Sequence, residues 1–225
     1  MSKEIIFGTS AREELVKGID KLADAVVATL GPNGRNVVID NGESPQSTKD
    51  GVTVAKSISL SNPTQELGVK LVKQAAIQTA NKAGDGTTTS TLLAREMVKA
   101  GLKAVALGEN AVNIKRDIDK AVQTVTTKLK EIAEDISSED QLEQIATVSA
   151  NNDVDTGKLI ATAIDKVGME GVVHIEESRT GETYLETVEG MQFDRGFKSP
   201  YFVTDNNSMS SVLENPMILL IDQKL

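Results

Sequence analysis

The stretch with the richest chemistry is residues 83–97, AGDGTTTSTLLAREM. Glycines stand on both sides of Asp85, three threonines follow at Thr87–Thr89, and an apolar run comes next. The first N–H groups of a helix lack partners within the helix, and with the helix dipole they attract anions, above all phosphate. Glycines let the backbone curl round an anion, hydroxyls add donors, and a carboxylate beside a phosphate requires a cation such as Mg²⁺ between them. The stretch therefore predicts a phosphate loop with a magnesium ligand, and the alternative is that Asp85 or Thr87 merely caps the helix.

Two other short stretches could bring the backbone close to a ligand. Residues 29–34, TLGPNG, follow a predicted helix, and glycine without a Cβ permits close approach, although the same residues also serve simply to end a helix. Residues 49–51, KDG, place Asp50 before the next element, where it is either a functional carboxylate or an N-cap. The sequence contains neither a Walker motif nor a Rossmann fingerprint, so a nucleotide site here would have a different design. The single histidine, His174, has no signalled partner and is assigned no role.

Long amphipathic segments must position these stretches. Apolar residues that recur at steps of three and four predict helices over 9–29, 64–82, 87–107 and 110–134, and shorter ones over 139–147 and 153–167. A hairpin is predicted from NVVID at 36–40, the turn Asn41-Gly42 and the return at 47–49, and VTVAKSI after Asp50 is a short helix or a strand. Strands are also predicted over VVHIEES (172–178), TYLETVEG (183–190) and ILLIDQ (218–223). The texture changes near 134 and near 190, which predicts domain boundaries there.

Composition limits the classes of function. A formal net charge of −9 and a pI near 4.8 argue against a general nucleic-acid binder, because phosphate contact needs a basic face. The chain has no cysteine, which excludes disulfides and thiolate metal sites. The start, MSKEIIFGTS, has no apolar stretch of signal-peptide length, and no window approaches a membrane span. We therefore expect a cytoplasmic protein that binds neither nucleic acid nor membrane.

Seven motifs occur in an order that resembles a known family. They are TLGPNGRNVVID, TKDGVTVAK, AGDGTTTSTLLA, GLKAVALGENAVNIKRDIDKAV, VSANND, TGKLI and EGMQFDRGFKSPYF. Together they closely resemble the group I chaperonins, the GroEL and chaperonin-60 family, from about Lys3 to the last residue. The resemblance implies an ATP-dependent chaperone subunit that assists protein folding in a ring complex, with ATP hydrolysis driving domain rotation.

The resemblance also implies a multidomain architecture. Residues 1–134 would form the first segment of a mainly α-helical equatorial ATP-binding domain with a β-hairpin, residues 135–190 the first segment of an α+β intermediate hinge domain, and residues 191–225 the start of an α/β apical client-binding domain. The implied cofactors are ATP, Mg²⁺ and K⁺. The implied partners are unfolded client proteins, a lid co-chaperonin and further copies of the chain in a homo-oligomeric ring.

Site roles follow from the resemblance residue by residue. The residues that match nucleotide-binding positions are Thr29, Leu30, Gly31, Pro32, Lys49, Asp50, Gly51, Asp85, Gly86, Thr87, Thr88, Thr89 and Asn151. Among them Asp85 would hold Mg²⁺, the carbonyls of Thr29 and Lys49 would hold K⁺, and Asp50 would be the catalytic carboxylate near the attacking water. Matches to client-binding positions are Phe197, Ser199, Tyr201 and Phe202, and Gly190 matches a hinge.

Some features depart from the family pattern. Asn33 replaces a usual lysine, the hairpin segment NGESPQST is a residue short, and Lys198 stands where an apolar residue is common. The sequence ends at Leu225, whereas the family's subunit is much longer and includes a further essential aspartate and C-terminal equatorial helices. The 225-residue chain alone is therefore expected to be an inactive ATPase and to form no closed ring. Two other functions stay open: a truncated chaperonin-derived module that holds non-native protein without ATP turnover, and an unrelated phosphate-binding enzyme.

Overall fold

The structure is a computed structural model that describes most of the chain. The described residues are 5–42, 44–168, 171–176, 178, 181–187, 190, 196–219 and 221. The chain divides into two compact units, Met1–Lys158 and Leu159–Leu225. The domain boundaries expected near 134 and 190 stay predictions.

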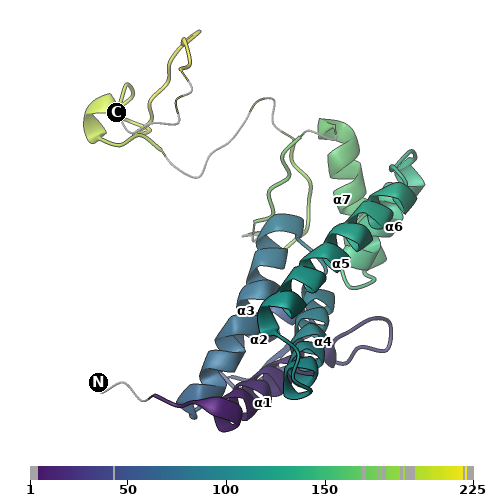
Figure 1. Ribbon diagram of the computed structural model, residues 1–225. Coiled ribbons are helices and arrows are strands. Elements are labelled where there is room, and N and C mark those ends of the chain that lie inside the picture. The colour runs from purple at the N-terminus through teal and green to yellow at the C-terminus, as the bar shows by residue number, and fades with distance from the viewer. Residues whose placement is uncertain are drawn as a thin grey trace. The chain divides into compact units, whose positions relative to one another are not determined.

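Helices dominate the first unit (Figure 1). They are α1 (Gly8–Val27), α2 (Gly51–Ser57), α3 (Pro63–Ala83), α4 (Thr87–Ala106), α5 (Ala111–Ile132), α6 (Glu139–Ser149) and α7 (Val154–Val167), the last of which contains the division between the units. Each helix predicted from apolar spacing is confirmed, with both ends within two residues of the expected ones. The segment after Asp50, which the sequence left open between helix and strand, is helical.

Short polar side chains fix where several of these helices begin. Asp50 caps α2, Asn62 caps α3 ahead of Pro63, and Asn110 caps α5, each accepting hydrogen bonds from two backbone N–H groups of the first turn. At the other end of α3, Gly84 takes the left-handed conformation with φ 73° and closes the helix. These local signals explain why the observed ends agree so closely with those read from the sequence.

The core of the first unit forms where α1 crosses α2, α3 and α4. Its buried side chains come from α1, α2 and α3: Ile19, Leu22, Val26, Val54, Ala55, Val69, Val72 and Ala76. The crossing of α1 and α3 depends on two glycines, because a Cβ on Gly18 would overlap the carbonyl of Gln65 and one on Gly68 would overlap the carbonyl of Leu15. Aliphatic packing around close backbones therefore replaces the bulk that aromatic residues supply in other cores.

The predicted hairpin is confirmed. Strands β1 (Val37–Ile39) and β2 (Gln46–Thr48) pair antiparallel, with Val37 opposite Thr48 and Ile39 opposite Gln46. This pair is the single sheet among the described residues. It connects the end of α1 to the start of α2, and thereby links the TLGPNG and KDG stretches.

The further strands that the sequence predicted are not found among the described residues of the second unit. Beyond α7 its described residues contain one 3₁₀ turn, η1 (Pro200–Phe202), and a single bridge between Asp205 and Ser210. The predictions of strands are wrong for 172–176, 178 and 183–187, and for 218, 219 and 221; the other residues of these segments, with 191–195, lie outside the described residues. A strand needs a partner for its backbone groups and a covered face for its apolar side chains. Val172, Ile175 and Ile218 are all exposed, so their apolar side chains lack a covered face, and the described residues of these segments belong to no sheet.

Candidate functional site

Three stretches far apart in the sequence meet at the beginning of α4. The hydroxyl of Thr29, at the end of α1, lies 3.3 Å from the hydroxyl of Thr88. Gly51, the first residue of α2, packs against the same hydroxyl so closely that a Cβ would overlap it, and such a Cβ would be 3.5 Å from the backbone nitrogen of Thr88. We call Thr29, Gly51, Thr88 and the loops that carry them the loop cluster. Three of the sequence-predicted motifs therefore share one location.

The start of α4 has no capping side chain. Gly86 occupies the N-cap position in the left-handed conformation, φ 82°, and no side chain accepts a hydrogen bond from the first turn. The Asp85 carboxylate instead accepts the N–H of Gly86 itself, at 2.6 Å, and stays exposed. The alternative in which Asp85 or Thr87 caps the helix is therefore wrong. The free N–H groups of the first turn and the positive end of the helix dipole make this a favourable place for an anion.

The threonines of this turn differ in their surroundings. Thr87 is buried, and its carbonyl accepts the hydroxyls of Ser90 and Thr91 at 2.9 Å each. Thr88 is half-buried next to Thr29, whereas Thr89 is exposed. Thr87 therefore anchors the turn from inside, while Thr88 and Thr89 are the hydroxyls that a ligand could reach.

Asp50 is held from two sides. Its backbone N–H donates to the hydroxyl of Thr48 at the end of β2, at 3.1 Å. Its carboxylate accepts the N–H of Val52 at 3.3 Å on Oδ1, and both the N–H and the hydroxyl of Thr53 on Oδ2, at 2.8 and 2.5 Å. The N-cap interpretation of Asp50 is confirmed. Since Gly51 is part of the loop cluster, the cap also fixes a carboxylate beside that cluster.

The TLGPNG stretch forms a tight loop after α1. Thr29 is buried and donates its hydroxyl to the carbonyl of Val26 at 2.7 Å. The N–H of Gly34 donates to the carbonyl of Gly31 at 3.0 Å, and a Cβ on Gly34 would overlap the carbonyl of Thr29. Gly31 has φ 69° with open space where its side chain would be, and Leu30 and Pro32 are exposed. The loop thus presents bare backbone next to the start of α4, as the sequence suggested.

The remaining predicted site residues are Lys49, on the same loop as Gly51, and Asn151 and Gly190, farther along the chain. Lys49 is half-buried after β2. Asn151 is exposed in the turn between α6 and α7 with φ 58°, and its N–H donates to the carbonyl of Val148 near the end of α6. Gly190, in the second unit, has φ 113° and open space around it. Among the described residues no hydrogen bond joins Asn151 to the loop cluster, so its role and that of Gly190 stay predictions.

The residues expected to contact client protein are on the surface of the second unit. Tyr201 is 98% exposed and Phe202 62% exposed, and Phe197 is exposed as well. Ser199 caps the 3₁₀ turn by accepting the N–H of Tyr201 at 3.4 Å. Exposed rings in an aromatic-poor chain are compatible with an interaction surface, but their role in client binding stays a prediction.

Sequence reasoning missed the two threonines that fix Asp50. Thr48 and Thr53 were given no role, although aspartate followed three residues later by a hydroxyl residue is a recognisable helix start. The same spacing recurs at Asp153 and Thr156, at the start of α7, where the hydroxyl of Thr156 donates to the carboxylate at 2.9 Å. A search for this spacing would have found the Asp50–Thr53 and Asp153–Thr156 pairs, but not Thr48, which precedes Asp50 by two residues.

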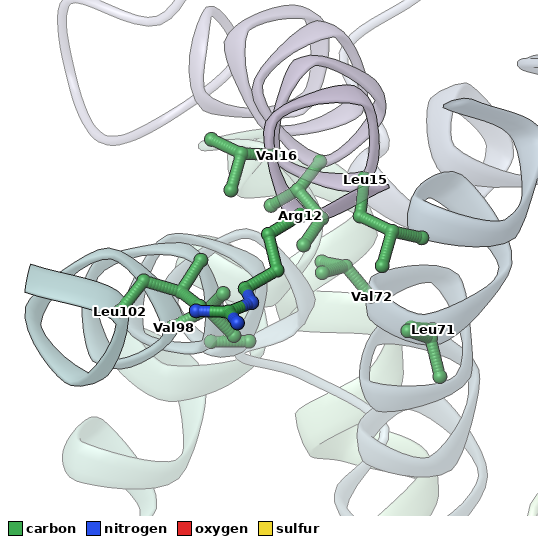
Figure 2. Close-up of a pocket in the computed structure, with 9 residues that line it drawn as sticks. Arg12, Leu15, Val16, Leu71, Val72, Val98 and Leu102 are labelled. Carbon is green, nitrogen blue, oxygen red and sulfur yellow. The ribbon is translucent and has the colours of Figure 1, made fainter. Parts of the chain in front are cut away.

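An apolar hollow lies away from these predicted site residues, between α1, α3 and α4 (Figure 2). Its volume is about 230 Å³, and its lining residues are Arg12, Leu15, Val16, Ile19, Leu71, Val72, Ala94, Val98 and Leu102. With a single charged side chain in the lining, it offers no set of groups for acid–base or metal chemistry. In the described part of the chain no group of three or more histidine, aspartate or glutamate side chains could hold a metal ion, and no helix there is long and apolar enough to cross a membrane.

Comparison with known proteins gives consistent matches. The family model described as the TCP-1/cpn60 chaperonin family matches residues 22–225. Among solved structures, the chaperonin gp146 from the bacteriophage EL 2 (Pseudomonas aeruginosa), in the presence of ATP-BeFx, is 32% identical in one crystal form, with a TM-score of 0.59 over 69% of this chain and 28% of that chain. A second crystal form gives 31% identity over 70% and 28% of the two chains, with the same TM-score of 0.59.

A more distant structure shares the fold. A group III chaperonin in the open state is 22% identical, with a TM-score of 0.59 over 70% of this chain and 32% of that chain. At this identity the likeness concerns the fold alone. The present chain thus spans less than a third of the length of each of these solved chains.

Proposed function

Because this chain belongs to the TCP-1/cpn60 chaperonin family, we propose that it is the nucleotide-binding portion of an ATP-driven protein-folding subunit of the group I type. The observation that carries the proposal is the loop cluster, where Thr29, Gly51 and Thr88 meet at an uncapped helix start. The phage chaperonin that it resembles was crystallised in the presence of ATP-BeFx, which supports a nucleotide as the ligand.

The residues present fit a magnesium nucleotide. Phosphate oxygens would accept the free N–H groups of the first turn of α4 and the hydroxyls of Thr88 and Thr89, and the bare backbone of the TLGPNG loop would lie alongside. The exposed carboxylate of Asp85 would hold Mg²⁺, which is commonly bound by one or two carboxylates together with phosphates. The metal would supply charge neutralisation at the transferred phosphate. By the family resemblance, carbonyls of Thr29 and Lys49 would hold K⁺.

Asp50 would orient the water that attacks the terminal phosphate. In that reaction the water oxygen forms a bond to phosphorus, the bond to the bridging oxygen breaks, and ADP leaves with the electron pair while a proton leaves the water. Asp50 supplies an exposed carboxylate next to Gly51, and therefore next to the loop cluster. Asn151 would approach the nucleotide when the domains rotate about Gly190.

The remaining parts of the proposal concern the whole protein. Clients would bind the surface formed by the exposed rings of Phe197, Tyr201 and Phe202 with the half-buried Ser199. Subunits would assemble into a homo-oligomeric ring, and a lid co-chaperonin would close it in the cytoplasm. A module that holds non-native protein without turnover would expose the same rings. Steady-state ATP hydrolysis by the full-length assembled protein separates these two functions, because only the first consumes ATP.

The proposal is tested at Asp85. In the full-length protein, Asp85→Ala should lower the Mg²⁺-dependent affinity for ATP about tenfold or more, measured by isothermal titration calorimetry. Asp135→Ala, which removes an exposed carboxylate between α5 and α6, serves as the matched control and should leave the affinity unchanged. An Asp85→Ala variant with the wild-type affinity in Mg²⁺ would remove the proposed metal site.

A further inference from the structure

The two oxygens of the Asp50 carboxylate have unequal surroundings. Oδ2 accepts two short hydrogen bonds from one residue, Thr53, from its N–H at 2.8 Å and its hydroxyl at 2.5 Å. Oδ1 accepts one long bond, from the N–H of Val52 at 3.3 Å. Because a carboxylate oxygen has two lone pairs, Oδ2 is saturated within the protein, and Oδ1 keeps acceptor capacity.

The backbone beneath this carboxylate is fixed as well. The N–H of Asp50 donates to the hydroxyl of Thr48, which pairs with Val37 in the hairpin. The next residue, Gly51, is buried against Thr88 of the loop cluster. The side-chain torsions of Asp50 are thus the remaining freedom of the group, and the hydroxyl of Thr53 restricts them.

We propose that Thr53 is a positioning residue for ATP hydrolysis, which holds Oδ2 of Asp50 so that Oδ1 is the oxygen that engages the attacking water. The proposal rests on the proposed function, since it takes Asp50 as the carboxylate beside that water. In this role Thr53 acts only through its contacts with Asp50. A water held by one oriented oxygen attacks along a defined line, whereas a carboxylate free to rotate shares the water between two oxygens.

Capping alone is the competing explanation of the same contacts. Asp153 and Thr156 make an equivalent hydroxyl-to-carboxylate contact at the start of α7, where Asp153 also accepts two backbone N–H groups. Loss of a cap lowers stability without requiring a change in turnover. The two explanations therefore differ in whether the effect of Thr53 on the rate depends on Asp50.

The test is a double-mutant cycle in the full-length assembled protein. Thr53→Val keeps the shape of the side chain and removes the hydroxyl, so kcat should fall about tenfold. Nucleotide affinity should stay within about twofold of the wild type, since the phosphate contacts are untouched. Thr53→Ser, which restores a hydroxyl, should recover most of the rate. In an Asp50→Ala background, Thr53→Val should cause no further loss of kcat.

Each other outcome overturns the inference, and the outcomes show whether the proposed role of Thr53 or that of Asp50 has failed. If Asp50→Ala lowers kcat and Thr53→Val does not, Thr53 is only a cap and the proposed role of Asp50 survives. If Thr53→Val lowers kcat equally with and without Asp50, its effect does not pass through the carboxylate. A wild-type rate for Asp50→Ala itself removes the proposed water-side role, and this inference with it. Thermal melting of Thr53→Val beside Thr156→Val gives the stability cost of cap loss, and Thr53→Ala carries the same cycle if the valine variant does not assemble.

Discussion

A single methyl group at Gly51 should disturb the loop cluster without unfolding the helices. A Cβ there would overlap the hydroxyl of Thr88, but it would lie 3.5 Å from both the backbone nitrogen of Thr88 and Cγ1 of Val26, which is ordinary contact. Since only the hydroxyl is in the way, Gly51→Ala should turn the Thr88 side chain to another rotamer. That rotation removes the 3.3 Å approach between the hydroxyls of Thr88 and Thr29.

The expected magnitudes separate stability from binding. Overpacking a core costs about 1–3 kcal/mol, and one off-rotamer torsion about 0.5–1.5 kcal/mol. Replacing a helical glycine by alanine returns roughly 0.5–1 kcal/mol. Because the clash here involves one rotatable hydroxyl, we expect the free energy of unfolding to change by no more than about 1 kcal/mol. Loss of a hydrogen bond from Thr88 to a charged phosphate should weaken nucleotide binding about tenfold.

The assay pairs calorimetric ATP titration with urea denaturation of the same variants. Gly101→Ala is the matched control: it lies within α4, and its Cβ would meet only Cγ2 of Ile114, at 3.8 Å. That control should be stabilised by about 0.5–1 kcal/mol with unchanged ATP affinity. Wild-type affinity in Gly51→Ala would refute the assignment of the Thr88 hydroxyl to phosphate. A large loss of stability would show instead that the starts of α2 and α4 cannot adjust separately.

Two further predictions concern the client surface and the response to acid. Replacing both Tyr201 and Phe202 by serine should abolish capture of a chemically unfolded client, measured by light scattering. The melting temperature should not change, because both rings are exposed. A lower melting temperature with normal capture would contradict the prediction and indicate that the rings are part of a core. The pKa of Asp153 is lowered, chiefly by the backbone N–H of Thr156 and then by the Thr156 hydroxyl. This carboxylate therefore stabilises the fold at pH values above the ordinary aspartate pKa of about 3.9. The stabilisation is lost as the pH falls through the lower pKa of the folded state. Thr156→Val should therefore lower the melting temperature at pH 7 more than in strong acid, and an equal loss at both would contradict the linkage.

Local signals account for the parts of the fold that the sequence predicted. Asn62 and Pro63 start α3 and Gly84 ends it through contacts within a few residues, so the sequence contains the whole explanation. The hairpin is equally local. The meeting of Thr29, Gly51 and Thr88 could be proposed from the sequence only through the family resemblance, because periodicity does not tell which helix ends become neighbours. At that meeting point Gly51 approaches Thr88 more closely than a side chain with a Cβ would allow.

The expectations that failed required partners distant in the sequence. VVHIEES has the composition of a strand, but Val172 and Ile175 are exposed and the described part of the segment pairs with nothing that would make it a strand. The pattern of apolar residues predicts which face of an element should be buried. It does not tell which other part of the chain packs against that face. A strand is thus a weaker prediction than a helix of the same apolar content, because a helix satisfies its backbone by itself.

A helix, too, can form without a covered apolar face, and α5 is an example. No residue of α5 is buried, although its apolar residues share one stripe; those on its second half are Val122, Val125, Leu129 and Ile132. The stripe forms from local periodicity, and its cover would have to come from elsewhere. The loop cluster does not depend on any element that would cover α5. Its contacts are made by the ends of α1, α2 and α4, which nearby hydrogen bonds fix. If the proposed function is right, nucleotide binding should therefore depend mainly on residues of the loop cluster that are already in place.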